Sequence, residues 1–322
     1  MSSLAKNSTI YLVGSVFTAI GSIVSIPLLT HSLSVEDYGI YDLLLKISEV
    51  VTLTIFFGCR PAYIRIYFDY KSAEWQKKVT ATMILFLLSM IFFILMLILC
   101  FKSYIFGSFI DFDRYREAFN LMILWVITEI LFNMTLTFLM INEKATYYVS
   151  LSVFKVSIYL ILLYFIVYRS SFGVKGVFLS NLIITASIAL ISMIKLSKWS
   201  KLKFSQEILI ELLKFGLPIL PTAVLSYLLL SMDRFFLVSN NYDIELGIFS
   251  FGSKIAFMAI SLLFQPIGRI WAPFCFKRFN NSGGPRDIGL LFERIAILSS
   301  LGFVFLISLY CSFRVFFQLF CL

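Results

Sequence analysis

The chain has 322 residues, of which 60% are hydrophobic and only 14% are charged, and its formal net charge is +9. Soluble domains carry roughly 25% charged residues, so this composition excludes an ordinary soluble protein. Repeated apolar stretches of bilayer length must be helical, because lipid offers no partner to an open backbone N–H or C=O. We therefore predict an all-α, polytopic transmembrane helical bundle.

About nine apolar stretches approach the length of roughly 20 residues that a helix needs to cross a hydrocarbon core of about 30 Å. The third, for example, has 23 residues without a charge. The first is too long for the apolar region of a signal peptide and is interpreted as a retained span. In chain order, the predicted spans are 10–30, 40–59, 79–101, 119–141, 147–168, 174–194, 214–238, 246–267 and 295–313.

The basic residues are unevenly distributed between alternate connections. The N-terminus and the connections 60–78, 142–146, 195–214 and 268–294 hold 17 Lys and Arg, and the opposite side holds 6. Because cytoplasmic loops carry the excess of Lys and Arg, we predict a multi-pass protein of the cytoplasmic membrane with its N-terminus in the cytoplasm. The same distribution explains the net charge without a nucleic-acid partner.

A short internal repeat connects the second and eighth stretches. Gly39-Ile40-Tyr41 followed by Lys46-Ile47 recurs 208 residues later as Gly247-Ile248-Phe249 followed by Lys254-Ile255. Both copies run in the same direction, which is typical of transporters whose two halves are parallel repeats. We predict an N-terminal lobe at 1–194 with six spans, a cytoplasmic linker at 195–213, and an incomplete second lobe at 214–322 with three. Since the repeat predicts six spans there too, the chain is expected to be C-terminally truncated.

Several segments resemble a known family. They are Lys6-Asn7-Ser8, Pro27-Leu28-Leu29-Thr30, the run from Leu33 to Asp42, Ala62 to Phe68, Phe215-Gly216-Leu217-Pro218 and Met232-Asp233-Arg234-Phe235. Together they are similar to bacterial polysaccharide flippases, the O-antigen and capsule repeat-unit exporters of the multidrug/oligosaccharidyl-lipid/polysaccharide exporter superfamily.

The resemblance implies a function. The expected substrate is a polyprenyl-pyrophosphate-linked oligosaccharide, flipped across the bacterial inner membrane by alternating access. It also implies contact with membrane lipids and with other polysaccharide assembly proteins, and coupling to an H+ or Na+ gradient as in some relatives, with no other cofactor. The family has twelve or more spans, and this chain departs from that pattern at its C-terminus.

Ionisable residues inside the spans are costly in lipid and therefore informative. Asp42, Lys46 and Glu49 follow one another at spacings of four and three, which places them on one helix face. Lys254 lies at the depth of Lys46 in the repeat. One hypothesis is an electropositive cavity in which Lys46, Lys254 and Arg234 attract the pyrophosphate.

The alternative is mutual neutralisation within the bundle: Asp42 with Lys46, Asp233 with Arg234, and Glu129 with Lys155. Glu49 and Glu129 are the candidates for a proton-coupling carboxylate. Arg65 lies just inside the cytoplasmic face, where it meets a head group on uptake or anchors the interface.

Two other functions compete with a flippase. A multidrug or small-solute exporter of the same fold would favour an acidic cavity, whereas the lysines favour an anionic ligand. A membrane-embedded glycosyltransferase or polymerase would carry a large external loop with catalytic residues, and the longest external loop, 102–118, has no recognisable catalytic spacing. The five cysteines and His31 have no metal-ligand spacing, so we predict no enzyme and no metal site.

Overall fold

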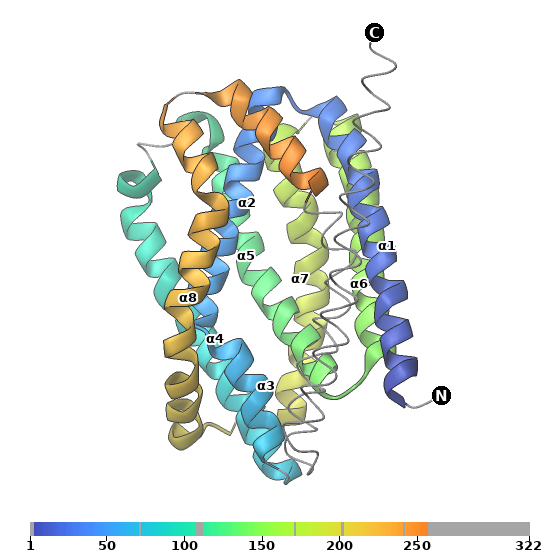
Figure 1. Cartoon of the computed structure of the whole chain (residues 1–322), viewed down its shortest axis with the longest axis vertical. Coiled ribbons are helices and arrows are strands. Elements are labelled where there is room, and N and C mark those ends of the chain that lie inside the picture. The colour runs from blue at the N-terminus through green and yellow to red at the C-terminus, as the bar shows by residue number, and fades with distance from the viewer. Residues whose placement is uncertain are drawn as a thin grey trace, which may run out of the picture.

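The computed structural model describes residues 3–70, 72–106, 112–170, 172–200, 203–240 and 242–256, and over this range the chain is a helical bundle (Figure 1). The helices are α1 (Ser3–Ser32), α2 (Val35–Phe56), α3 (Cys59–Asp69), α4 (Ala73–Phe106), α5 (Phe112–Ile141), α6 (Ala145–Leu162), the π-helix η1 (Leu163–Arg169), α7 (Gly173–Ser200) and α8 (Gln206–Ser239). A further helix occupies 243–256. The prediction of an all-α bundle is confirmed.

Six helices in the described residues are long and apolar enough to cross a membrane: α1, α4, α5, α6 with η1, α7 and α8. Helix α2 has 22 residues, which span about 33 Å at 1.5 Å per residue. It is not among the six, and it carries three charged residues, Asp42, Lys46 and Glu49, in its body. The helix at 243–256 covers only part of the predicted span 246–267, and 295–313 lies outside the described residues. The count of nine spans is therefore not confirmed.

The helices run alternately up and down, so their connections gather at two ends (Figure 1). The upper end carries the α1–α2 turn and the starts of α5, α7 and the helix at 243–256. Here Arg114 of α5 forms ion pairs with Glu36 and Asp37 of α2. The lower end carries the α3–α4, α5–α6 and α7–α8 connections. The order of connections follows the alternation that was predicted from the basic residues.

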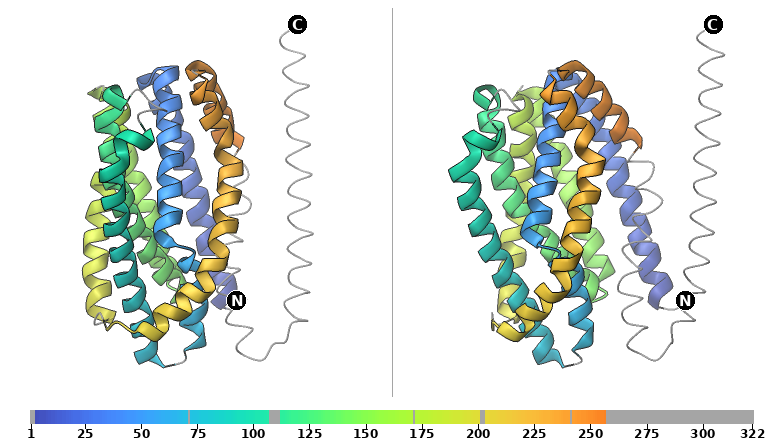
Figure 2. Two further views of the ribbon diagram at one scale, coloured as in Figure 1. Left: turned by 90° about the vertical axis from the view of Figure 1, so that its left-hand side faces the viewer. Right: turned by 60° about the vertical axis from the view of Figure 1, so that its left-hand side comes forward.

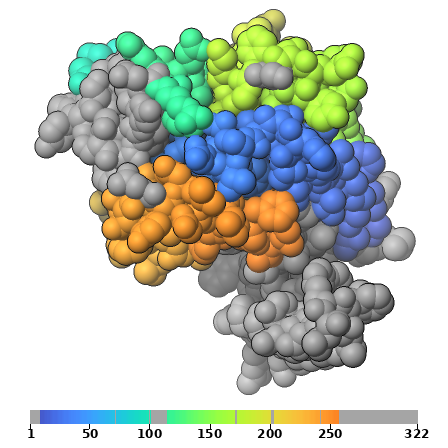
Figure 3. All heavy atoms as spheres, turned by 90° about the horizontal axis from the view of Figure 1, so that it is seen from above, coloured from blue at the N-terminus to red at the C-terminus, as the bar shows by residue number. Residues whose placement is uncertain are grey.

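The bundle is arranged around α2, in which Leu43 and Leu44 are fully buried. Seen from above, the upper parts of α1 and α2 lie between α5–α7 on one side and α8 with the helix at 243–256 on the other (Figure 3). On the first side, α5 packs along α7. Helix α2 therefore faces α5–α7 on one side and α8 with the helix at 243–256 on the other.

Helix α3 lies where the sequence predicted a loop between residues 60 and 78. Phe57 and Gly58 adopt left-handed conformations, with φ of 49° and 68°, and they end α2. The next eleven residues form a new helix that buries Ala62 and Tyr63, and Tyr63 shares a hydrogen bond of 3.0 Å with Thr80 of α4. The apolar spacing of three and four residues in this segment was the signal for a packed helix.

Helix α8 is bent (Figure 2), and it contains Pro218 and Pro221. Proline lacks the N–H that would bond to the carbonyl four residues earlier, and its ring crowds that carbonyl, so a bend is expected there. Helix α7 continues to Ser200 and α8 begins at Gln206, so the non-helical connection is shorter than the predicted linker 195–213. The division into two lobes remains a prediction, since most of the second lobe lies outside the described residues.

Candidate functional site

The buried charges of α2 and α8 meet in one ion pair. Arg234 donates from Nε to Oδ2 of Asp42 at 2.5 Å, and the two side chains are 3% and 10% exposed. The sequence had instead suggested Lys46 as the partner of Asp42 and Asp233 as the partner of Arg234. Both of these pairings are wrong, because α8 places Arg234 directly against the inward face of α2. Asp233 has an exposed side chain.

Arg234 connects more than two helices. A terminal nitrogen of its guanidinium donates to the carbonyl of Leu230 at 3.3 Å, and the guanidinium lies over the ring of Phe249 at 5.2 Å from the centroid. Phe249 belongs to the helix at 243–256, so this single side chain contacts α2, α8 and the following helix. A buried arginine satisfied in this way fixes the position of α8 against α2.

Lys254 lies beside the same pair. Its Nζ is 5.6 Å from the centroid of the Tyr38 ring and 5.4 Å from that of Tyr41, which are cation–π distances. Within the described residues no carboxylate lies within 4.0 Å of this ammonium group. Among the described residues, Asp42 is therefore the one carboxylate in this cluster with the two cations Arg234 and Lys254. We call these three residues, with Tyr38 and Tyr41, the junction cluster.

Lys46 and Glu49 form a second, more exposed pair on α2. Their charged atoms are 3.1 Å apart, and the two side chains are 17% and 50% exposed. Tyr227 of α8 donates its hydroxyl to the backbone carbonyl of Lys46 at 2.9 Å, and the Lys46 ammonium lies 5.8 Å from the Tyr227 ring centroid. The sequence correctly placed Asp42, Lys46 and Glu49 along one helix, but the structure divides them between two sets of partners.

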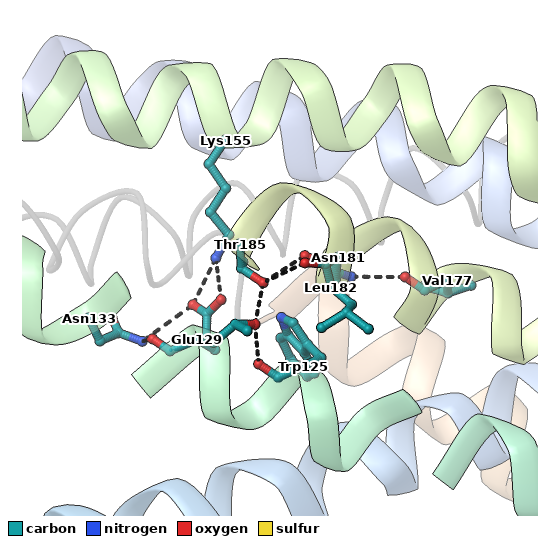
Figure 4. A network of polar contacts seen from close by, with 9 residues as sticks. Trp125, Glu129, Asn133, Lys155, Val177, Asn181, Leu182 and Thr185 are labelled. Carbon is teal, nitrogen blue, oxygen red and sulfur yellow. Dashed lines mark hydrogen bonds and ion pairs between the residues drawn. The ribbon is translucent and has the colours of Figure 1, made fainter. Parts of the chain in front are cut away.

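Glu129 of α5 and Lys155 of α6 pair with each other inside the bundle (Figure 4). Lys155 Nζ lies 2.7 Å from each carboxylate oxygen, and both side chains are 18% exposed. Asn133 donates to the same carboxylate at 3.3 Å. This is the neutralising arrangement that the sequence offered as an alternative. The ammonium contacts both carboxylate oxygens, so the ion pair connects α5 to α6.

Arg65 lies at the lower end, on α3. It lies over the Phe215 ring at 4.7 Å from the centroid and is 3.8 Å from Asp69, and both charged side chains are about half exposed. Close by, Tyr70 donates its hydroxyl to Glu211 of α8 at 3.2 Å. Desolvation, and next the Glu211 carboxylate, raise the pKa of Tyr70. Arg65 is therefore separate from the junction cluster, at the opposite end of α8.

From the sequence alone, the aromatic residues of the junction cluster were not identified as site residues. Tyr38 and Tyr41 are 4% and 5% exposed and supply the ring faces for Lys254. Their spacing of three residues, immediately before Asp42, places all of them within one turn of helix. In a chain with 16 tyrosines and 36 phenylalanines, that spacing alone does not distinguish a functional ring from a packing ring.

Comparisons with known proteins agree on a family and a fold. The family model described as polysaccharide biosynthesis protein matches residues 28–313. A crystal structure of MATE in complex with Br-NRF superposes with a TM-score of 0.63 at 17% identity, over 85% of this chain and 66% of that one. Another solved structure, protein A, gives a TM-score of 0.71 at 16% identity, over 94% of this chain and 71% of that one. No curated protein matched. The likeness to the two structures establishes a MATE-like fold.

Proposed function

Because the chain belongs to the polysaccharide biosynthesis protein family, we propose that it translocates polyprenyl-pyrophosphate-linked oligosaccharides across the bacterial inner membrane by alternating access. In this proposal the N-terminus and the lower end face the cytoplasm. The junction cluster and Lys46 line the path of the diphosphate. The chain acts as a flippase and catalyses no covalent step.

The observation that supports this proposal is the excess of positive charge in the junction cluster. Among the described residues, Arg234 pairs with Asp42 and Lys254 lies over the rings of Tyr38 and Tyr41, so two cations stand beside one carboxylate. An unbalanced charge is expensive away from water, so the arrangement favours a site that an anionic group completes. A diphosphate supplies that charge, and arginine and lysine both bind phosphate oxygens with charge-assisted hydrogen bonds.

The same observation separates the flippase from its alternatives. An exporter of cationic drugs on this fold needs acidic groups in its cavity, and the net charge of the junction cluster has the opposite sign. A membrane glycosyltransferase or polymerase needs a catalytic acid or base beside its acceptor. The buried carboxylate of Asp42 and the partly buried carboxylate of Glu129 are both engaged in ion pairs, which leaves them poorly suited to that role.

The test measures translocation in proteoliposomes with a fluorescent polyprenyl-diphosphate-linked sugar. Lys254→Met is expected to reduce the rate about tenfold or more, which corresponds to the loss of one charge-assisted contact of about 1.5–3 kcal/mol. Lys254→Arg keeps the charge and should retain most of the rate. Lys203→Met, which removes an exposed lysine at the lower end, is the matched control. A Lys254→Met protein that folds and transports normally would contradict the proposal.

Lys46 requires a different control, because its partner in the structure is Glu49. Lys46→Met alone leaves Glu49 uncompensated, whereas Lys46→Met with Glu49→Gln removes the pair together. If the double variant transports normally, Lys46 is a structural partner and has no role toward the diphosphate. If the double variant folds but transports poorly, Lys46 contributes to binding.

A further inference from the structure

Two contacts of different kinds hold the upper parts of α2, α8 and the helix at 243–256 together. One is the buried Asp42–Arg234 ion pair, and the other is a close crossing of Gly39 with Gly247. We propose that they form a latch that opens when an anionic ligand replaces Asp42 on Arg234. This inference rests on the proposed function, because the ligand is the diphosphate of the substrate.

The exchange follows from the donors that the two anions share. Arg234 presents its Nε and a terminal nitrogen to Asp42 and to the carbonyl of Leu230. A guanidinium binds a carboxylate or a phosphate through the same fork of N–H groups, so it cannot satisfy both fully. A diphosphate carries more negative charge than one carboxylate and also reaches Lys254. Binding therefore favours release of Asp42.

Released from Arg234, Asp42 becomes a buried carboxylate without a cation, which is strongly unfavourable. The cost is relieved if the upper part of α2 separates from α8 and exposes Asp42 to water. Ligand binding at Arg234 is thereby coupled to movement of α2, and the latch opens only when an anion is in place to compensate the arginine.

The glycine crossing permits such a movement. A Cβ on Gly39 would lie 3.0 Å from the backbone nitrogen of Gly247, and a Cβ on Gly247 would lie 2.3 Å from the Val35 carbonyl oxygen. The backbones approach closely here because neither glycine carries a side chain, and the side chains of Leu246 and Val35 pack beside the crossing. Two neighbouring groups, the Tyr38 hydroxyl and Ser250 Oγ, are buried without a hydrogen-bond partner in the described part of the chain. Such groups penalise the closed arrangement and would regain partners once water enters.

The experiment places spin labels at Glu36→Cys and Asp243→Cys, at the upper starts of the two helices, after replacement of the five native cysteines. Distances are measured by pulsed electron paramagnetic resonance in nanodiscs, with farnesyl diphosphate as the probe and farnesol as its uncharged control. The distance is expected to lengthen with farnesyl diphosphate and to stay unchanged with farnesol. Asp42→Asn should lengthen it without any probe.

Asp42→Asn leaves Arg234 unpaired and can fail to fold, so two further variants accompany it. Asp42→Asn with Arg234→Gln removes both charges and should give the long distance in a folded protein. Asp42→Arg with Arg234→Asp restores an ion pair across the same gap and should give the short distance. A folded neutral double variant that keeps the short distance, or a charge swap that keeps the long one, overturns the latch.

Binding of farnesyl diphosphate, measured separately by calorimetry, distinguishes failure of the latch from failure of the proposed function. Saturated binding without a change in distance overturns the latch and leaves the proposed function standing. Absence of binding to the wild-type protein and to folded Asp42→Asn alike overturns the diphosphate ligand, and with it both the latch and the proposed function.

Discussion

Gly39 of α2 and Gly247 of the helix at 243–256 lie in backbone contact, so that a Cβ on the first would meet the nitrogen of the second at 3.0 Å. These are the first residues of the two repeat copies, 208 positions apart in the sequence. Both helices begin at the upper end of the bundle (Figure 1), as a parallel repeat requires. The repeat therefore marks a contact surface as well as an internal similarity. A pseudo-two-fold superposition that brings Lys46 and Lys254 together remains a prediction.

Gly247→Ala is predicted to destabilise this contact, because the new Cβ would lie 2.3 Å from the Val35 carbonyl oxygen and backbone has to move. Gly252→Ala on the same helix is the matched control, since no described atom lies within 4 Å of its Cβ position. Alanine there should be neutral or stabilising by up to about 1 kcal/mol. Thermal unfolding in detergent checks the pair. Equal melting temperatures for the two variants would show that the crossing is not tightly packed.

Gly58→Ala should be among the most damaging single changes at the lower end. Gly58 has φ of +68°, and its Cβ would lie 2.2 Å from the carbonyl oxygen of Gly216 in α8. The backbone conformation alone costs a non-glycine residue about 1–2 kcal/mol, and the steric clash adds to it. Gly173→Ala isolates the first contribution, because Gly173 has φ of +59° and its Cβ would meet no atom within 4 Å in the described part of the chain. We expect Gly58→Ala to be clearly less stable than Gly173→Ala by thermal unfolding, and the reverse order would contradict the observed crossing.

Breaking the Glu129–Lys155 pair one side at a time is predicted to destabilise the fold by about 3–5 kcal/mol, because an unpaired charge remains inside the bundle. Glu129→Gln with Lys155→Met removes both charges and should recover most of the stability, as measured by thermal unfolding. The transport rate of this double variant then tests the role of the pair. Normal transport identifies a structural tie. A folded double variant that no longer responds to a proton or sodium gradient would instead identify Glu129 as part of ion coupling.

The orientation in the membrane is testable by cysteine labelling in whole cells. With the N-terminus in the cytoplasm, Glu36→Cys and Asp243→Cys at the upper end should react with an impermeant maleimide from the periplasm. Glu74→Cys and Lys203→Cys at the lower end should react only after permeabilisation. The opposite pattern would invert the topology derived from the basic residues and would place the junction cluster nearer the cytoplasm.

The sequence alone determined the helical membrane class, the order of the helices and the residues whose charge needs explanation. These conclusions depend on local properties of the sequence. They are the length of each apolar stretch compared with the bilayer thickness, the charge of the connecting loops, and the spacing of residues along a helix. The resemblance carried by its segments anticipated the polysaccharide biosynthesis family. The repeat drew attention to Gly39 and Gly247, although the sequence did not indicate that they touch.

Only the tertiary structure decided which charges pair. Asp42 has Lys46 one turn away on its own helix, yet it pairs with Arg234, 192 positions distant. Spacing along a helix indicates which residues share a face, but it does not indicate which residues pack against that face. Inside a low-dielectric bundle a charge takes the partner that is buried with it, because that partner is least screened. Asp42 and Arg234 are buried together where α2 meets α8, and Lys46 and Glu49 remain one turn further along, where the surface is more open.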